Sequence, residues 1–385
     1  MNNPPIYLDY AAATPIDERV IAAMQPFFVD KFYNPSSPYA PAVEIRREYE
    51  AAKDRLAHTF GATGGELVMT AGATESINLV FQSVGGHVVS STIEHKAVIE
   101  AAKQHEYTFV EVGETARVDP EVIRAAIRPD TQLVSIGLAN SELGTIQPLR
   151  HIAEVVAKER RAREEKGDHT PLLFHSDASQ GMGLVDINVA RLGVDLLTLN
   201  AAKVYGPKQV GLLWQKPSVA LHPTIVGGGQ ERGLRSGTEN VAGVVGFALA
   251  AELVSKRRDT EVKRLGGLRD TLEKQLLETF PDAVITGSRK HRLVNYLHIS
   301  FPRIDAERII FMLEMQGIYV ATGSACSANK GTASHVLMAL GLSDDVIGGS
   351  LRITLGHQTT DGGIKQAAKN IIEAIQYEYD RMGGK

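Results

Sequence analysis

A lysine in an unusual position has the clearest chemical potential in this sequence. Lys203 follows an apolar, strand-like run over residues 194–199 and stands shortly before the turn-forming pair Gly206-Pro207. An ammonium group at the end of a buried strand is costly unless it is paired or functional. A lysine amine held there can form a covalent bond with a carbonyl group. We therefore predict that Lys203 is a covalent catalyst.

A second candidate lies directly after an expected strand over residues 66–70. The segment Ala71-Gly72-Ala73-Thr74 has small side chains that let the backbone approach a ligand. A helix that begins there would offer N–H groups to an anion, and Thr74 adds a hydroxyl. Ala73 and Thr74 are therefore candidates for binding a phosphate. A plain strand-to-helix turn with an N-cap residue would have the same pattern.

Three more polar side chains follow expected strands. Asp177 can keep a heterocyclic nitrogen protonated, Gln180 can donate to a ring oxygen, and His95 can stack on a flat cofactor and move protons. Taken singly, Asp177 could be an N-cap and His95 a structural histidine. With Lys203 and Thr74 they describe one chemistry, that of a pyridoxal phosphate (PLP) site, whose protonated ring withdraws electrons from the substrate.

The elements that must position these residues alternate between strands and helices. Strands are expected over residues 66–70, 87–91, 108–112, 132–139, 172–175 and 194–199, with amphipathic helices over 119–128 and 149–166 between them. This rhythm predicts an α/β fold with a mainly parallel, helix-covered sheet. In such sheets ligands bind beyond the carboxyl ends of the strands. The candidate residues lie at those ends.

The pattern changes after about residue 240. Two helices are expected over residues 241–258 and 260–279, separated by charges near residues 256–259. Strands over 294–301 and 351–355 and helices over 305–316, 334–340 and 361–382 then indicate a smaller α+β domain. We expect a large domain over residues 16–255 that binds the cofactor. Residues 1–15 and 256–385 are expected to form the small domain.

Composition narrows the class of protein. The 385 residues are 43% hydrophobic and carry a formal net charge of −4, which argues against nucleic acid or an anionic membrane as a direct partner. No apolar run is long enough to span a bilayer, so we expect a cytoplasmic protein. The single cysteine, Cys326, excludes an internal disulfide and a Cys-cluster metal site, and no metal is expected. Cys326 is either an inert hydrophobe or a reactive thiol in a polar loop.

Several ordered motifs resemble those of one enzyme group. They are YLDYAAATP at residues 7–15, NPSS at 34–37, GATES at 72–76, EHK at 94–96, NSELG at 140–144 and QERGLRSGTEN at 230–240. In these motifs the chain resembles the cysteine desulfurases of the NifS/IscS group, within the class V aminotransferase-like, fold type I PLP enzymes. The resemblance covers nearly the whole chain. It implies a large domain with a mainly parallel central sheet and a smaller α+β domain.

The resemblance implies a role for each matched residue of the cofactor site. Lys203 would form the Schiff base, Asp177 would pair with the pyridinium nitrogen, and Gln180 would hydrogen-bond the ring hydroxyl. His95 would stack on the ring and shuttle protons, and Thr74 would bind the phosphate. Cofactor-binding positions also include Ala73, Asn140 and Asn200.

Further matches concern the substrate and the subunits. Asn34 and Asn140 match positions near the substrate, and Arg352 matches the arginine that holds the substrate carboxylate, a task suited to a planar guanidinium. Thr238 matches a residue that reaches the phosphate of the neighbouring subunit. The resemblance therefore implies a homodimer with composite active sites.

The loop around Cys326 resembles the catalytic-cysteine loop of the group. Its thiolate would take the sulfur of L-cysteine as a persulfide, leaving L-alanine as the product. The sulfur would then pass to an acceptor or scaffold protein, for iron–sulfur cluster assembly or tRNA thiolation. A selenocysteine lyase or a class V aminotransferase would share most of these residues, although a catalytic Cys326 disfavours a transaminase.

The chain departs from the group's pattern beside the lysine. The group has Ser-x-His-Lys where this chain has Asn200-Ala201-Ala202-Lys203, and an arginine where it has His357. Asn200 can still donate a hydrogen bond to a phosphate, but Ala202 cannot. A charge-assisted contact of this kind is worth roughly 1.5–3 kcal/mol. Weaker retention of PLP is expected, and a paralogue with weakened PLP binding is the third alternative.

Overall fold

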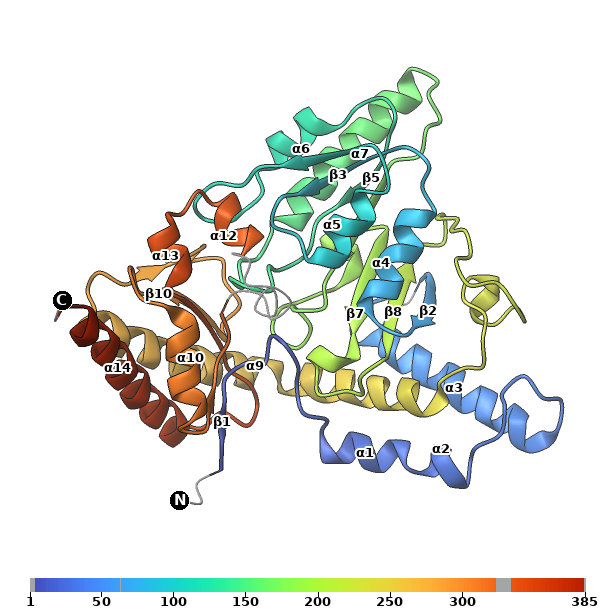
Figure 1. Cartoon of the computed structure of the whole chain (residues 1–385). Helices are drawn as coiled ribbons and strands as arrows, with labels where there is room; N and C mark the ends of the chain where they lie inside the picture. Colours follow the sequence, from blue (N-terminus) through green and yellow to red (C-terminus); the bar gives the residue numbers. More distant parts are fainter. Residues whose placement is uncertain (1–3, 63, 323–333, 384–385) are drawn as a thin grey trace.

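The computed structural model describes residues 4–62, 64–322 and 334–383 of the chain (Figure 1). A seven-stranded sheet forms its centre, and a smaller sheet with its own helices lies beside it. No helix in the described ranges is long and apolar enough to cross a membrane. The expected α/β architecture is confirmed.

The central sheet is mostly parallel. Its strand order is β2 (Glu66–Thr70), β8 (Gly211–Gln215), β7 (Leu196–Asn200), β6 (Leu173–Asp177), β5 (Thr131–Ser135), β3 (His87–Ser91) and β4 (Tyr107–Val110). Only β8 runs antiparallel to its neighbours, β2 and β7. The carboxyl ends of β2, β3, β6 and β7 therefore meet at one edge. β8 was not among the expected strands.

Helices cover both faces of this sheet. On one face, α4 (Ala73–Gln82) and α5 (Lys96–Ala102) pack against alternate strand residues such as Leu196 and Leu213. On the other face the next residues along the same strands, Leu197 and Leu212, join a larger core. That core includes α3 (Ala40–His58), α6 (Pro120–Ala126), α7 (Leu149–Glu165) and the first part of α9 (Val241–Thr279).

Three short helices complete the large unit. They are α1 (Glu18–Met24), α2 (Pro26–Val29) and α8 (Val189–Leu192). Alternation of buried residues along each strand thus accounts for the layered arrangement, because successive side chains point to opposite faces.

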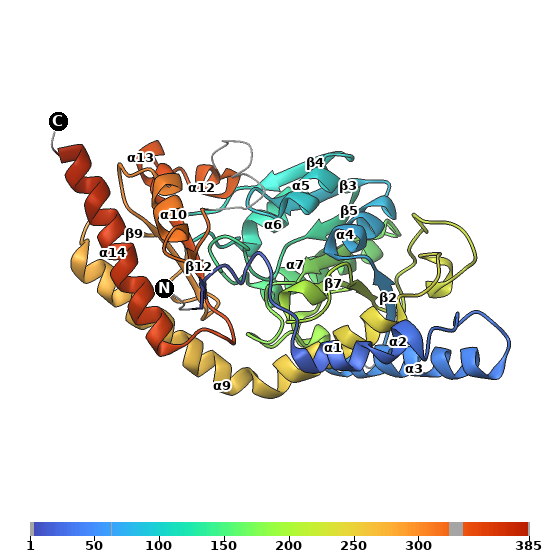
Figure 2. The same ribbon diagram turned by 60° about the horizontal axis from the view of Figure 1, so that its bottom comes forward.

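Helix α9 corrects one expectation. The expected break near residues 256–259 is wrong, because α9 is a single helix of 39 residues. Lys256 and Asp259 are exposed, and charged side chains on a solvated face do not interrupt a helix. Val244 and Val254 lie in the core of the central sheet, whereas Leu265 and Leu272 lie in the core of the smaller unit. Figure 2 shows α9 running beneath both.

The smaller unit contains two sheets. One has the order β12 (Ser350–Thr354), β10 (Tyr296–Ser300) and β9 (Val284–Ile285), all antiparallel. The other pairs β1 (Ile6–Tyr7) in parallel with β11 (Ile318–Tyr319). The helices are α10 (Ala306–Glu314), α12 (His335–Ala339), α13 (Asp344–Gly348) and α14 (Asp361–Gly383).

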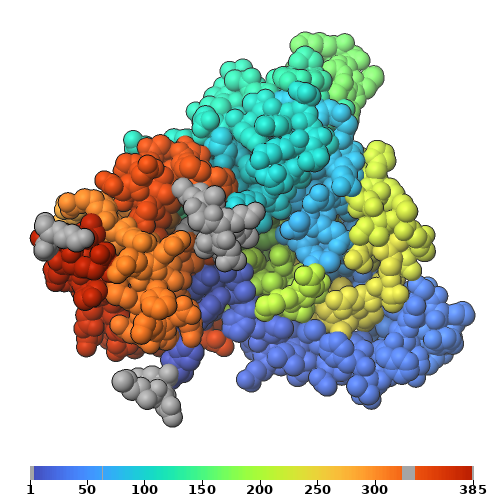
Figure 3. Space-filling view, in the orientation of Figure 1, coloured from blue at the N-terminus to red at the C-terminus, as the bar shows by residue number. Residues whose placement is uncertain are grey.

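The N-terminal segment joins the two units. Leu8 is fully buried in the core of the small unit, and the residues that follow it cross towards the central sheet. In the space-filling view this dark blue segment lies between the orange-to-red small unit and the large one (Figure 3).

Candidate active site

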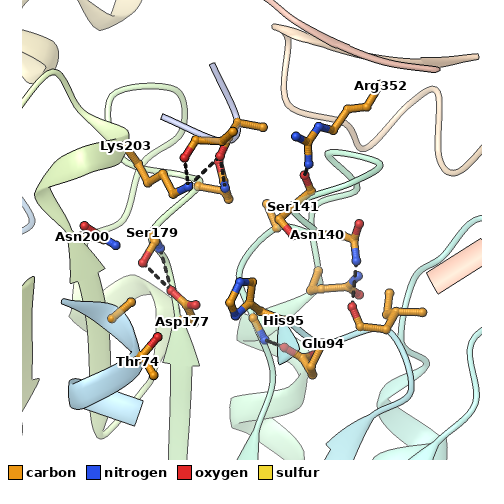
Figure 4. Close-up of a pocket in the computed structure, with 18 residues that line it drawn as sticks. Thr74, Glu94, His95, Asn140, Ser141, Asp177, Ser179, Asn200, Lys203 and Arg352 are labelled. Carbon is orange, nitrogen blue, oxygen red and sulfur yellow. Dashed lines mark hydrogen bonds between the residues drawn. The ribbon is translucent and has the colours of Figure 1, made fainter. Parts of the chain in front are cut away.

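A cavity of about 340 Å³ lies at the carboxyl edge of the central sheet, facing the small unit (Figure 4). It is lined mainly by polar side chains that sequence reasoning singled out. Among the lining residues are Ala73, Thr74, His95, Asn140, Asp177, Gln180, Asn200, Lys203 and Arg352. The structure thus brings most of the predicted site residues into one pocket.

Lys203 ends a short 3₁₀ turn, η1 (Ala201–Lys203), directly after β7. Its Nζ donates to the carbonyl oxygens of Ala11 and Ala12, each at 2.7 Å. The turn itself is fastened to the same N-terminal segment, because the Thr14 hydroxyl donates to the carbonyl of Ala202 at 3.0 Å. Sequence reasoning missed these backbone partners. Alanine side chains carry no signal of a carbonyl contact.

Asp177 is the last residue of β6 and lines the cavity. Its Oδ1 accepts hydrogen bonds from the backbone N–H of Ser179 at 3.0 Å and from the Ser179 hydroxyl at 2.6 Å. Both bonds fall on Oδ1, which leaves Oδ2 as the oxygen able to accept from an N–H group of a ligand. Ser179 was missed, although its place two residues after an aspartate is a turn signal.

His95 caps α5 and lines the same cavity. Its Nδ1 accepts from the backbone N–H of Ala97 at 3.1 Å, which leaves the ring proton on Nε2. Burial, the largest influence, lowers the pKa of His95. A neutral imidazole with its Nε2 edge available can take part in proton transfer near pH 7.

Glu94 precedes His95 in the chain, lines the same cavity and is buried. Its Oε1 accepts from the Ser91 hydroxyl at 2.7 Å and its Oε2 from the backbone N–H of Gly137 at 2.9 Å. Burial raises the pKa of Glu94 to about 7, and the charge of Asp177 acts in the same direction. A Cβ at position 137 would lie 2.9 Å from Oε2, so any larger residue there would displace the Glu94 carboxylate.

One end of the cavity suits a phosphate. Ala73 and Thr74 form the first turn of α4, whose N-cap residue, Gly72, provides no side-chain hydrogen bond. Asn200 also lines this end, and its Oδ1 accepts from the N–H of Ala202 at 3.1 Å. The Asn200 amide nitrogen is thus the donor that can reach an anion. A helix N-terminus, a hydroxyl and an amide are together suited to bind an anion.

Gln180 and Asn140 are held by the protein itself. Gln180 donates from Nε2 to the carbonyl of Ala11 at 3.1 Å and accepts from the Tyr296 hydroxyl at 2.8 Å. Asn140 donates to the carbonyl of Ile93 at 2.8 Å, and its Oδ1 accepts from two backbone N–H groups that follow it. Each amide nitrogen has a second hydrogen for a ligand.

Arg352 approaches the cavity from β12, on the side of the small unit. One terminal nitrogen donates to Asp9 Oδ1 at 2.6 Å and the other to the carbonyl of Ser141 at 3.2 Å. The side chain is only 4% exposed. A buried guanidinium at a pocket wall is well suited to hold a carboxylate.

Two of the predicted residues do not line this pocket, and a third lies outside the described residues. Asn34 is exposed, and its side chain accepts from the N–H of Ser36 at 2.9 Å. Thr238 is also exposed and lies outside the pocket lining. Cys326 lies outside the described residues. Their expected roles stay predictions.

The donors in the pocket fit PLP better than a metal. An amine, a carboxylate and an anion cradle match the aldehyde, pyridine nitrogen and phosphate of that cofactor. In the described part of the chain, no group of three or more His, Cys, Asp or Glu side chains could hold a metal ion.

Comparison with known proteins agrees with this geometry. The sequence profile of the family described as Aminotransferase class-V matches residues 6–366. A NifS-like protein of known structure superposes with a TM-score of 0.88 at 33% identity, covering 97% of this chain and 100% of that one. The chain therefore belongs to the class-V aminotransferase family.

Within that family, the curated relatives most similar to the chain include cysteine desulfurases. Cysteine desulfurase IscS of Dictyoglomus turgidum is 40% identical over 386 residues, covering 96% of this chain and 95% of the relative. Cysteine desulfurase IscS 1 of Archaeoglobus fulgidus is 41% identical over 382 residues, covering 96% and 97%. The expected likeness to the NifS/IscS group is confirmed.

Proposed function

We propose that this protein is a cysteine desulfurase that uses PLP to convert L-cysteine into L-alanine. The observation that carries the proposal is the meeting of Lys203, Asp177 and Arg352 in one cavity, on a fold and sequence similar to those enzymes over nearly their full length. When bound, PLP supplies a protonated ring that withdraws electrons from the substrate carbon bearing the amino group.

The residues of the pocket would divide the work as follows. The Lys203 amine would bind the cofactor aldehyde, and Thr74, Ala73 and Asn200 would hold the phosphate. Asp177 Oδ2 would keep the ring nitrogen protonated. Arg352 binds the substrate carboxylate at the opposite side of the cavity, as Figure 4 shows for the two basic residues.

Two groups in the pocket can transfer protons. The Lys203 amine and the neutral His95 imidazole are the groups that would remove the α-proton of the substrate and return a proton to the product. Both line the same cavity. The lowered pKa of His95 keeps the imidazole in its basic form at neutral pH.

Sulfur transfer is assigned to Cys326 from the sequence alone. Its thiolate attacks the substrate sulfur, so that an S–S bond forms and the C–S bond breaks. The electron pair of the broken bond stays on the substrate carbon, which is protonated to give alanine. No external oxidant or reductant is needed in this step.

Several finer points belong to the same proposal. Thr238 would complete the phosphate site of a second subunit in a homodimer, and Asn34 would lie near its substrate. The large domain would span residues 16–255, with residues 1–15 and 256–385 in the small one. An acceptor or scaffold protein would receive the sulfur for iron–sulfur cluster assembly or tRNA thiolation.

The test is an assay of the purified, PLP-loaded protein with L-cysteine and a thiol reductant. Alanine and sulfide should appear in equal amounts. Lys203→Ala should lose both products and the absorbance of lysine-bound PLP. Cys326→Ser should keep that absorbance and lose sulfide release. Transfer of the amino group to a 2-oxo acid without sulfide would contradict the proposal, and a strong preference for selenocysteine would favour the lyase.

A further inference from the structure

The guanidinium of Arg352 is held at two points. Asp9 Oδ1 accepts from one terminal nitrogen at 2.6 Å, and the carbonyl of Ser141 accepts from the other at 3.2 Å. The Nε of Arg352 is buried and has no hydrogen-bond partner in the described part of the chain. The short contact to Asp9 is therefore the main constraint on the plane of the guanidinium.

Asp9 is itself fixed to the strand that carries Arg352. It forms a parallel bridge with Thr354, two residues further along β12. The backbone N–H of Thr354 donates to Leu8 at 2.8 Å, and the Tyr7 hydroxyl donates to the carbonyl of Asp9 at 2.8 Å. The carboxylate is thus presented to the guanidinium by a rigid backbone.

Asp9 contacts Arg352 from outside the pocket. Of these two residues only Arg352 lines the cavity. A substrate carboxylate can therefore approach the guanidinium from the pocket while Asp9 stays bound behind it. This arrangement describes a positioning residue and not a catalytic one.

The other neighbours of the guanidinium do not replace this contact. His298 is the cross-strand partner of Arg352 and is fully buried, and neither ring nitrogen has a partner among the described residues. Burial, followed by the charge of Arg352, lowers the pKa of His298 to about 3, so the ring is neutral. Glu142 is buried nearby, but its carboxylate accepts from the Ser334 hydroxyl.

We propose that Asp9 orients Arg352 for the carboxylate of the substrate. The inference rests on the proposed function, which gives Arg352 this ligand. A carboxylate is recognised by two parallel N–H bonds, which requires the guanidinium plane to be fixed before the ligand arrives. Without Asp9, one bond of 3.2 Å to Ser141 is left to hold a side chain with four rotatable bonds.

The test compares two amines that differ only in the carboxylate, L-alanine and ethylamine. Their dissociation constants are measured on the PLP-loaded protein by calorimetry and by the absorbance of the cofactor. Asp9→Ala should raise the dissociation constant of L-alanine about tenfold or more, which is the equivalent of one hydrogen bond to a charged group. The dissociation constant of ethylamine should change less than about twofold, because ethylamine has no carboxylate to bind Arg352. KM for L-cysteine should rise while kcat changes little.

Asp9→Asn should recover most of the lost affinity, because its amide oxygen can accept the same bond. Asp17→Asn is the matched control, since it removes an equal charge from the same N-terminal segment at a side chain that pairs with Arg19. Should Asp9→Ala not fold, Asp9→Ser replaces it, because its hydroxyl is one atom shorter than the carboxylate. Circular dichroism verifies folding of each variant.

Three results would overturn the inference. They are unchanged L-alanine binding in Asp9→Ala, an equal loss for both amines, and no recovery in Asp9→Asn. Arg352→Ala separates this inference from its premise. If Arg352→Ala leaves L-alanine binding intact, the carboxylate role in the proposed function is wrong. If Arg352→Ala weakens binding and Asp9→Ala does not, only the role of Asp9 is wrong.

Discussion

Glu94 is the residue whose ionisation the fold changes most clearly near the site. Its pKa rises from an ordinary 4.5 to about 7 because the carboxyl group is buried. The native state therefore keeps a proton that the unfolded chain releases at lower pH. It follows that stability falls as the pH rises from about 4.5 to 7.

Glu94→Gln should remove this dependence. The difference in unfolding free energy between the variant and the parent should grow by about 3 kcal/mol in favour of the variant from pH 4.5 to 7, and stay constant above pH 7. Urea unfolding of both proteins at several pH values measures this difference in free energy. A difference that is flat with pH would show that Glu94 titrates normally.

In the proposed PLP site, Asn200 and Ala202 should determine how firmly the phosphate is held. Asn200→Ala should raise the dissociation constant of PLP about tenfold, because it removes an amide donor from the anion cradle. Ala202→His should lower it by a similar factor, by restoring the imidazole that the group has there. Equilibrium dialysis gives both constants. Equal dissociation constants of PLP in the parent and both variants would mean that other donors bind the phosphate.

At the level of elements, one buried carboxylate fastens the turn η2 (Glu231–Gly233) to the large unit. Glu231 accepts from the Tyr49 hydroxyl at 2.5 Å, from Lys53 Nζ at 3.0 Å and from the N–H of Met69 at 2.7 Å. The backbone of Glu231 and of Arg232 has positive φ, 46° and 57°. These contacts stabilise a conformation that non-glycine residues rarely adopt. The turn leads directly to the segment that carries Thr238.

Glu231→Ala should destabilise the protein by about 3–5 kcal/mol, because it leaves the ammonium of Lys53 buried without its carboxylate. Chemical unfolding measures the loss. Glu121→Ala, which breaks an exposed pair with Arg124, should cost less than about 1 kcal/mol. Similar costs for the two variants would contradict the structural role of Glu231.

At the scale of the whole molecule, α9 extends from the core of the central sheet into the core of the smaller unit. Gly267 lies exposed in its interior, and an added Cβ would meet nothing within 4 Å. Gly267→Ala should therefore stabilise the protein by about 0.5–1 kcal/mol. Thermal unfolding tests this. Gly243→Ala is the contrasting variant, since its Cβ would lie 2.4 Å from the Asn240 side chain, and it should lower the Tm.

Local signals in the sequence predicted part of the site, whereas contacts between residues far apart in the sequence could not be predicted. The polar residues at strand ends were readable because parallel strands share one edge, and Asp177, Asn200 and Lys203 do meet there. Ser179 and Glu94 act through specific hydrogen bonds that a hydrophobic pattern in the sequence does not predict. Asp9 reaches Arg352 across 343 residues of sequence, a pairing that only the folded chain brings about.

The N-terminal segment carries a practical consequence. Chain ends are usually expendable, and expression tags or start sites are often moved there. Here the carbonyls of Ala11 and Ala12 contact Lys203, and Leu8 is packed inside the core. A shortened form that starts at residue 16 would lose the bonds of Lys203 to the carbonyls of Ala11 and Ala12 and the bond of Arg352 to Asp9. An affinity tag that needs trimming is better attached after α14, whose final residues are exposed.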